Sequence, residues 1–379
     1  MALMEKKEEV FSFLKSMGFP AVRVHHPVNH FDFTKKGRNI LVIGPMGAGK
    51  TEFAAKIYRD SQIALKKSDK IKELTTDGTS DRRIVYFIRS RMEEKRFPDA
   101  PKNAIVYRGG YKEIENIASI NSSFDLEKVI DQHPEVGTWI IDEAGFYDER
   151  LAYVVENYRK KHNVNFVFPM LILNFRKDIF NRTCRLIVQN ATDVFPLTAY
   201  CEHPDCITDA YYTYRYYLVD GVECPALYFD PLIIVQNSGI STDPKIPNYS
   251  TRCDKHHYLP GKEYTFLILK PLGELAYAGN INPLIKELKN IKYDIQKSEL
   301  YNHFIEKYVK GEKLNPIMMN ALRVSCIAEK ALIYLFSEEN IISNGQLKWI
   351  SREISGNIEY INERLIENKK NYLDDLQEE

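Results

Sequence analysis

The chain lacks any hydrophobic run long enough to cross a membrane. Its longest apolar stretches, such as Phe166–Leu173, fall far short of the roughly 20 residues that a spanning helix needs. The N-terminal segment is charged over Glu5–Glu9 and no apolar segment follows it, so we expect no secretory signal. We therefore expect a cytoplasmic protein without a membrane partner.

The chain also lacks an excess of charge of either sign, because 52 Lys and Arg balance 52 Asp and Glu. A domain that binds nucleic acid usually carries a basic excess, so we expect no direct nucleic-acid binding. Disulfides are rare in the cytoplasm, so we do not expect the six cysteines to pair with one another. Cys184, Cys224 and Cys326 stand alone and are interpreted as small buried apolar residues.

Strand-like and helix-like stretches alternate from Arg38 onward, and this alternation is typical of a parallel sheet flanked by helices. We therefore predict an α/β fold. The predicted strands are 40–43, 84–88, 104–107, 138–141 and 165–173, and the predicted helices are 50–64, 126–132 and 149–161. The charged segments 60–81 and 91–101 are predicted to be loops.

Composition divides the chain into four expected domains. They are an N-terminal helix and loop (1–37), an α/β core (38–194), a small lobe rich in Tyr, Cys and Pro (195–262) and a helical C-terminal region (273–379). The first contains a predicted helix at 5–17 and three histidines, His25, His26 and His30, for which packed or solvated side chains are favoured over a metal site. The lobe contains strand-like stretches at 210–219 and 232–236, and the C-terminal helices are predicted at 283–288, 300–309, 315–336 and 347–376.

The turn between the first predicted strand and helix of the core carries the pattern G-x-x-x-x-G-K-[ST]. Its residues are Gly44, Pro45, Met46, Gly47, Ala48, Gly49, Lys50 and Thr51. In this pattern the backbone N–H groups and the helix N-terminus face phosphates, the lysine reaches the β- and γ-phosphates, and the hydroxyl binds Mg²⁺. The alternative is a glycine-rich turn without a ligand. The motif predicts ATP and Mg²⁺ binding on a P-loop NTPase-type sheet.

Two adjacent carboxylates follow the predicted strand 138–141. Asp142 is placed to hold Mg²⁺, as the acidic residue at the end of a buried strand does in P-loop enzymes. Glu143 is the candidate general base, which takes a proton from an acceptor hydroxyl or orients a water. The alternative for Glu143 is a surface carboxylate at a strand end.

Two short-spaced pairs of metal-binding side chains lie in the lobe. Cys201 and Cys206 form the first pair, and Cys253 and His256 form the second. Four such ligands can close a tetrahedral structural Zn²⁺ site, with His203 and His257 as competing ligands. Reduced cysteines without a metal are the alternative, and nothing indicates a catalytic cysteine.

The order of these motifs resembles the zinc-containing, type II thymidine kinase family over roughly residues 38–260. The family pattern is a P-loop, Asp-Glu-x-x-Phe, a phenylalanine-bearing loop, Leu-Thr-Ala-x-Cys and Tyr-x-x-x-Cys-x-x-Cys/His. Here the motifs begin at Gly44, Asp142, Asn174, Leu197 and Tyr249. The resemblance implies a nucleoside kinase that transfers phosphate from ATP to the 5′-hydroxyl of a deoxynucleoside, thymidine first. It also implies a homo-oligomer, either a dimer or a tetramer.

The resemblance assigns roles to individual residues. It implies that Glu143 is the general base and that Met46 approaches the nucleobase of the substrate. Phe146, Phe175, Phe180, Thr198 and Tyr249 correspond to residues that form or close the nucleoside pocket. A segment called the lasso, 237–249 here, reads the base through backbone groups in this family.

The sequence departs from the family pattern near the expected pocket. Gly145 replaces the usual Gln, and Asn174 ends a segment that is usually Gly-Leu-Asp. The 89–95 segment only partly matches the family's Lys-Pro-x-x-Asp-x-Arg, and the helical residues after 273 have no counterpart in the family. The alternative function is therefore an ATP-binding regulatory or interaction module with altered or lost kinase activity. A P-loop helicase is disfavoured, because no further motor motif is present.

Overall fold

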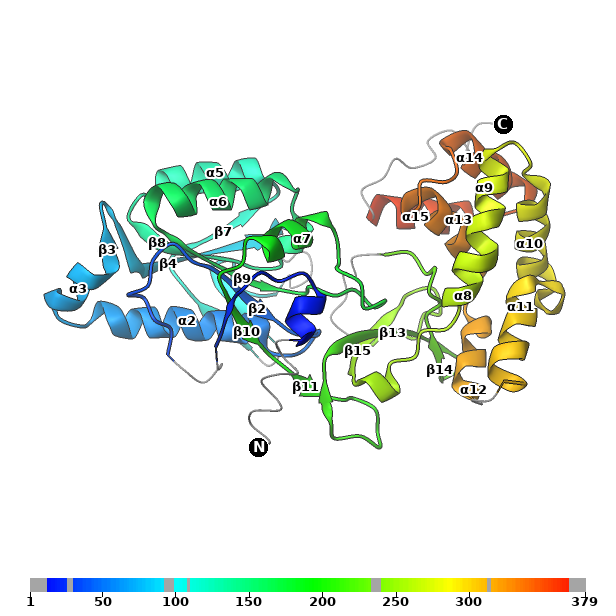
Figure 1. The fold of residues 1–379 in the computed structure, drawn as a ribbon, viewed down its shortest axis with the longest axis horizontal. Helices are drawn as coiled ribbons and strands as arrows, with labels where there is room; N and C mark the ends of the chain where they lie inside the picture. The colour runs from blue at the N-terminus through cyan, green and yellow to red at the C-terminus, as the bar shows by residue number, and fades with distance from the viewer. Residues whose placement is uncertain are drawn as a thin grey trace. The chain divides into compact units, whose positions relative to one another are not determined.

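The computed structural model describes residues 12–25, 30–91, 99–107, 110–232, 240–311 and 315–367. Contacts divide the chain into two compact units (Figure 1). The first unit comprises Met1–Thr213 and Ser250–His256, and the second comprises Tyr214–Tyr249 and His257–Glu379. The division runs through the lobe expected at 195–262, whereas the four expected domains themselves stay a prediction.

An eight-stranded sheet forms the centre of the first unit. Its order is β1-β10-β2-β9-β8-β4-β3, with β7 also paired to β4. All of these pairs are parallel except β3 with β4. The strands are β1 Arg23–Val24, β2 Asn39–Ile43, β3 Thr76–Asp77, β4 Ser80–Ser90, β7 Ile117–Ile120, β8 Val136–Ile141, β9 Asn165–Met170 and β10 Asp193–Pro196.

Helices cover both faces of this sheet, which confirms the predicted α/β fold (Figure 1). Successive side chains of β2 point to opposite faces. Ile40 and Val42 pack with α2 (Lys50–Leu65), and Leu41 and Ile43 pack in the cluster that contains α5, α6 and α7. These three helices are Ser123–Gln132, Arg150–His162 and Arg182–Gln189. Burial on both faces explains why β2 reads as a continuous apolar run.

Two expectations about this unit are wrong. The predicted strand 104–107 does not join the main sheet, because β5 (Ala104–Tyr107) pairs with β6 (Gly110–Glu113) in a separate antiparallel hairpin. The charged segment 60–81 is not a loop, since it contains the end of α2, the helix α3 (Asp69–Thr75) and the start of β4. Tertiary contacts pair some of its charges, as in the ion pair of 3.2 Å between Asp77 and Lys36. Residues 92–98 of the other predicted loop lie outside the described residues.

A buried carboxylate joins three strands at one edge of the sheet. Asp193, at the start of β10, accepts hydrogen bonds from Arg23 Nε on β1 and Arg38 Nη2 before β2, each at 2.8 Å. His25 Nε2 lies 2.6 Å from the same carboxylate, and its ring stacks on Phe195. His25 is therefore a packed side chain, and His26 lies outside the described residues. Burial alone would raise the pKa of Asp193, but its hydrogen bonds with the two arginines outweigh burial and hold that pKa well below its usual value.

The second unit contains part of a small sheet and a set of helices. The sheet has the order β14-β13-β15, with β13 Tyr212–Val219, β14 Val222–Pro225 and β15 Asn248–Arg252. The helices are α8 Lys262–Tyr264, α9 Lys270–Tyr277, α10 Asn282–Tyr293, α11 Glu299–Phe304, α12 Pro316–Met319, α13 Ile327–Ser337, α14 Asn344–Glu353 and α15 Ile358–Glu367. None of the helices described in either unit is long and apolar enough to span a membrane.

The two longest predicted C-terminal helices are each broken in the structure. The stretch 315–336 is interrupted before α13 at Cys326, and the stretch 347–376 is interrupted between α14 and α15 at Ser355. Ser355 follows the C-cap of α14 with a φ angle of 47°, and a left-handed residue at this position ends a helix. Cys326 has a φ angle of 58° and is the N-cap of α13, so helical backbone begins only after it. Residues 368–376 lie outside the described part of the chain.

A buried charge cluster fixes the segment that connects β14 to β15. Arg215 donates from Nη1 to Asp230 Oδ1 at 2.9 Å and from Nε to the Tyr249 hydroxyl at 2.8 Å, so it holds both described ends of the segment. Lys330 on α13 donates to Asp230 Oδ2 at 2.8 Å. Burial lowers the pKa of Lys330 to about 8 despite this partner. The helices after residue 273 therefore contribute Lys330 to the buried charge cluster around Asp230.

We expect Asp193→Asn to destabilise the first unit by about 3 kcal/mol, because breaking a buried ion pair leaves a charge such as Arg38 without its partner. The measurement is urea unfolding followed by Trp139 fluorescence in a Trp349→Phe background, which removes the tryptophan of the second unit. Glu135→Gln is the control, since that carboxylate is half exposed.

The pH dependence of this effect has a defined sign. The lowered pKa of Asp193 contributes stability above the ordinary Asp pKa of about 4, and this contribution is lost as the pH falls toward the folded-state pKa. The difference between the wild type and Asp193→Asn should therefore shrink below about pH 4. A constant difference down to pH 2 would contradict the assignment.

Candidate active site

The P-loop joins β2 to α2 in the geometry that its sequence predicts. Gly47 and Gly49 have φ angles of 84° and 82°, which residues with a Cβ rarely adopt. A Cβ on Gly44 would lie 2.7 Å from the carbonyl oxygen of Leu197, so the chain after β10 passes too close for any side chain there. The glycines of the motif are thus required by backbone conformation and by close packing.

The P-loop and the residue after β8 meet through two side chains, those of Thr51 and Asp142. Thr51 Oγ1 donates a hydrogen bond to Asp142 Oδ2 at 3.3 Å, and Asp142 is almost fully buried. A hydroxyl and a carboxylate are oxygen ligands that suit Mg²⁺. Lys50 lies in the same loop, and its ammonium donates to the carbonyl oxygens of Pro45 at 2.9 Å and Gly44 at 3.2 Å. The structure therefore brings together the predicted phosphate and magnesium residues.

Glu143 follows Asp142 in an uncommon backbone conformation. Its φ and ψ angles are 44° and 47°, in the left-handed region. Its N–H donates to the Pro169 carbonyl at 2.9 Å and to Asp142 Oδ1 at 3.1 Å, which stabilises this conformation. Its carboxylate is half-buried and accepts a bond from the Leu171 N–H at 3.4 Å. Strained non-glycine residues of this kind cluster at functional sites.

The predicted pocket residues differ in their burial and in the unit to which they belong. The rings of Phe146 and Phe180 meet edge to face, with centroids 5.9 Å apart, and both are partly exposed. Phe175 is buried beneath the guanidinium of Arg176. Thr198 is exposed between β10 and β11 (Ala199–Tyr200). Tyr249 belongs to the second unit, where Arg215 binds its hydroxyl.

The loop that carries Phe175 is organised by Asn174. Its side-chain oxygen accepts hydrogen bonds from the N–H groups of Arg176 at 2.8 Å and Asp178 at 3.2 Å. The loop closes through a bridge between Leu173 and Ile179. An aspartate would use the same oxygen for the same bonds. Asn174 therefore accepts the two hydrogen bonds that an aspartate could accept at this position.

Gly145 is explained by a neighbouring cysteine. A Cβ at Gly145 would lie 2.6 Å from the sulfur of Cys184, which is fully buried on α7. The volume next to the backbone that a larger residue would need is thus occupied by sulfur. Burial and the nearby charge of Glu143 raise the pKa of Cys184 to about 12, so its thiol stays protonated. Cys184 therefore acts as packing beside the site, as the sequence predicts.

A cavity of about 900 Å³ begins at the P-loop and extends along α2 to the β5–β6 hairpin. Its volume lies in the range of small-molecule sites. Ala48 and Gly49 line one end, and Lys56, Arg59 and Lys112 contribute cationic side chains. Acidic side chains from α2 and the hairpin also line it, which makes the cavity mixed in charge.

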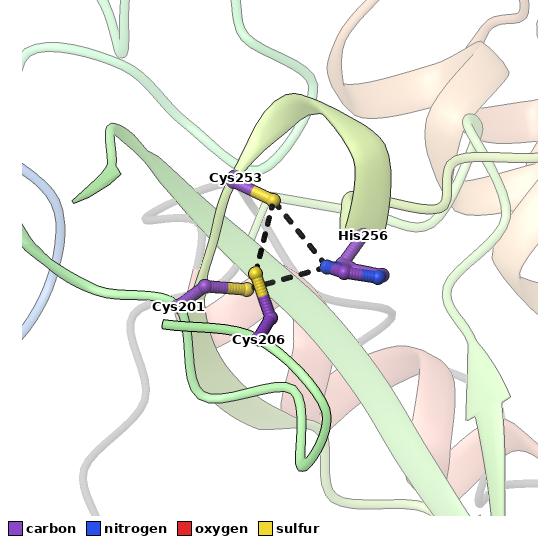
Figure 2. A group of neighbouring side chains, drawn as sticks. All are labelled: Cys201, Cys206, Cys253 and His256. Carbon is purple, nitrogen blue, oxygen red and sulfur yellow. Dashed lines mark hydrogen bonds between the residues drawn. The ribbon is translucent and has the colours of Figure 1, made fainter. Parts of the chain in front are cut away.

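The four predicted metal ligands converge in the first unit (Figure 2). The Nδ1 atom of His256 lies 3.4 Å from Cys253 Sγ and 3.6 Å from Cys201 Sγ, and Cys206 Sγ lies 3.9 Å from Cys253 Sγ. A tetrahedron with Zn–S bonds of about 2.3 Å has S···S edges of about 3.8 Å. The geometry is therefore consistent with a structural zinc site.

The surroundings of this Cys/His cluster also suit a metal. The hydroxyl of Thr208 lowers the pKa of Cys206 to about 7, which favours the thiolate that binds metals. Of the two competing histidines, His203 stacks on His256 with centroids 4.0 Å apart, and His257 belongs to the second unit. Neither belongs to the converging group.

The comparison with known families agrees with this geometry. Residues 37–224 match the thymidine kinase family. Over this range, the chain belongs to the thymidine kinase family. A search of curated proteins finds no match to the chain. The family match ends before Cys253 and His256, so the second half of the Cys/His cluster rests on the spacing in the sequence and on the structure.

Two residues that the sequence analysis did not single out contact the P-loop of this thymidine kinase fold. The hydroxyls of Thr213 on β13 and Thr251 on β15 bond the backbone of Met46. Alternation along 212–219 is a signal for strand structure, but no pattern in the sequence connects either threonine to Met46. Only the folded chain shows that contact.

We expect Gly145→Ala to destabilise the first unit by about 2 kcal/mol, because the new methyl group overlaps Cys184 Sγ. Cys184→Ala should remove most of that penalty. A double-mutant cycle on urea midpoints measures the coupling. Equal costs of Gly145→Ala with and without Cys184 would show that the sulfur is not the obstacle.

We expect one zinc ion per chain by elemental analysis, and its loss in Cys253→Ser. Loss of one of four ligands opens the tetrahedron, and the lobe should melt at a lower temperature. Cys326→Ser is the matched control, because Cys326 lies in the second unit away from the converging group. Retention of zinc in Cys253→Ser would rule out this ligand set.

Proposed function

We propose that the protein transfers the γ-phosphoryl group of ATP to the 5′-hydroxyl of a deoxynucleoside, with thymidine as the first candidate. The observation that carries the proposal is the convergence of Thr51, Asp142 and Glu143 at the P-loop of a thymidine kinase fold. The Phe146–Phe180 pair next to Glu143 supplies an aromatic surface for a base.

The chemistry follows from the placement of charge. The N-terminus of α2 and Lys50 attract the phosphates and stabilise the charge that develops during transfer. Thr51 and Asp142 would hold Mg²⁺, which would supply further neutralisation of the phosphate charge. The oxygen of the 5′-hydroxyl forms a bond to the γ-phosphorus while Glu143 accepts the proton of that hydroxyl. The bond from that phosphorus to the β-phosphate oxygen breaks, and ADP leaves.

The nucleoside pocket is proposed from the family correspondence. Phe146, Phe175 and Phe180 would form its walls, and Thr198 would line it. The correspondence assigns a closing role to Tyr249 and the lasso as well, which belong to the second unit. The replaced residues Gly145 and Asn174 are both accommodated by this chain's own packing, which supports a retained site. The family correspondence also supports a cytoplasmic homo-oligomer.

A second candidate is an ATP-dependent regulatory or interaction module. The second unit favours it, because the matched family range ends at residue 224 and most of that unit lies beyond it. A panel of nucleosides incubated with labelled ATP distinguishes the two functions. Transfer of label to a deoxynucleoside supports the kinase, and release of phosphate alone supports the module.

We expect Glu143→Gln to lower kcat for nucleoside phosphorylation by roughly 100-fold or more while the KM for ATP stays within about twofold, since the amide cannot accept the proton. Glu149→Gln is the control, because Glu149 is exposed and bonded to Arg182. A variant with unchanged kcat would remove Glu143 from the mechanism. Lys50→Ala should instead weaken ATP binding itself.

A further inference from the structure

Two buried threonines hold the P-loop from the strands beside the Cys/His cluster. Thr213 Oγ1 accepts a hydrogen bond from the Met46 N–H at 3.1 Å, and Thr251 Oγ1 donates one to the Met46 carbonyl at 2.8 Å. Both threonines are 2% exposed, so water does not compete for these bonds. Both backbone groups of Met46 are therefore fixed, although its side chain is partly exposed.

Peptide planarity carries these contacts to the phosphate-binding atoms. In a trans peptide the C=O and N–H groups point in opposite directions, and the described chain contains no cis peptide. Because Met46 N–H faces Thr213, the Pro45 carbonyl faces the other way, where it accepts the bond from Lys50 Nζ at 2.9 Å. Because the Met46 carbonyl faces Thr251, the Gly47 N–H points away from Thr251.

The same threonine is linked through the backbone to the neighbourhood of two predicted metal ligands, Cys201 and Cys253. Thr251 precedes Cys253 by two residues on the chain. Its carbonyl accepts from the N–H of Glu202 at 2.8 Å, and its own N–H donates to Glu202 Oε2 at 3.1 Å. Glu202 follows Cys201 directly. A metal that joins Cys201 to Cys253 would therefore fix the strand that presents the Thr251 hydroxyl to the P-loop.

We propose that Thr213 and Thr251 are positioning residues for the triphosphate, and that the Cys/His cluster supports ATP binding through Thr251. Their hydroxyls fix the two peptide planes on either side of Met46. The first plane orients the Pro45 carbonyl toward Lys50, and the second fixes the direction of the Gly47 N–H. The inference rests on the proposed binding of the triphosphate at the P-loop. It gives the metal cluster a function in nucleotide affinity in addition to local stability.

The test measures Mg-ADP binding to the full-length protein by calorimetry. Thr251→Val is nearly isosteric but has no hydroxyl, and its Kd for ADP should rise about fivefold or more. Thr251→Ser retains the hydroxyl and should bind ADP within about twofold of the wild type. Ser250→Ala is the matched control on the same strand, because the buried Ser250 hydroxyl has no hydrogen-bond partner in the described structure.

Thr213→Val is an independent variant on another strand, and it should also raise the Kd for ADP. Kinetics should show a raised KM for ATP with the nucleoside KM and kcat little changed. Wild-type affinity in both valine variants would overturn the proposal, as would a serine variant that binds ADP as weakly as Thr251→Val. Failure to phosphorylate any nucleoside would overturn the proposed reaction but not this assignment, because the binding assay does not depend on turnover.

The connection to the metal cluster is tested by a cycle of variants. Cys253→Ser should weaken ADP binding in the wild-type background but have little further effect in Thr251→Val, since the hydroxyl is the route of the coupling. Additive effects of the two changes would overturn the part of the proposal that links the cluster to ATP binding. Unchanged ADP affinity in Cys253→Ser alone would also overturn the link between the cluster and ATP binding.

Discussion

The parallel pairing of β2, β9 and β8 is the constraint on which the site depends. β9 lies between the other two strands and pairs with both in parallel, so all three end at the same edge of the sheet. This geometry brings the P-loop after β2 to the carboxylates after β8, although Thr51 and Asp142 are 91 positions apart in the chain. If β8 ran opposite to β2, Asp142 would lie at the other edge of the sheet, and neither motif alone could then hold a nucleotide with its metal.

The packing around this edge accounts for the unusual residues of the site. Cys184 fills the space beside Gly145, and Asn174 organises the phenylalanine loop with its side-chain oxygen. Each replacement therefore has a local partner that keeps the backbone in place. In a closely packed protein a replacement is tolerated where the neighbouring side chains leave neither overlap nor a void.

Polar contacts connect the site to the rest of the first unit and order the second. Thr213 and Thr251 bond the P-loop, and Cys253 of the Cys/His cluster follows Thr251 by two residues in the chain. In the second unit, Arg215 and Lys330 surround Asp230 at the base of the segment where the lasso is expected. Buried charges of this kind are costly unless they are fully paired, so loss of one partner would destabilise this part of the second unit. Lys330 comes from the helices that the family does not explain.

Residue type and short spacing were enough to predict the features that depend on local chemistry. They identified the glycines and Lys50 of the P-loop, the carboxylates after β8 and the four Cys and His ligands, because each chemistry requires particular atoms at short separations. The alternation of apolar segments likewise predicted the parallel sheet. The departures at Gly145 and Asn174 were visible in the sequence, but their consequences were not.

Which distant groups meet could be learned from the folded chain alone. Folding placed Ala104–Tyr107 in a separate hairpin, formed helix and strand in the charged 60–81 segment, and broke the long C-terminal helices at left-handed residues. It also paired Gly145 with Cys184 and Met46 with Thr213 and Thr251. These outcomes depend on contacts between residues far apart in the chain, and the energies of such contacts override the local preferences that a sequence pattern records.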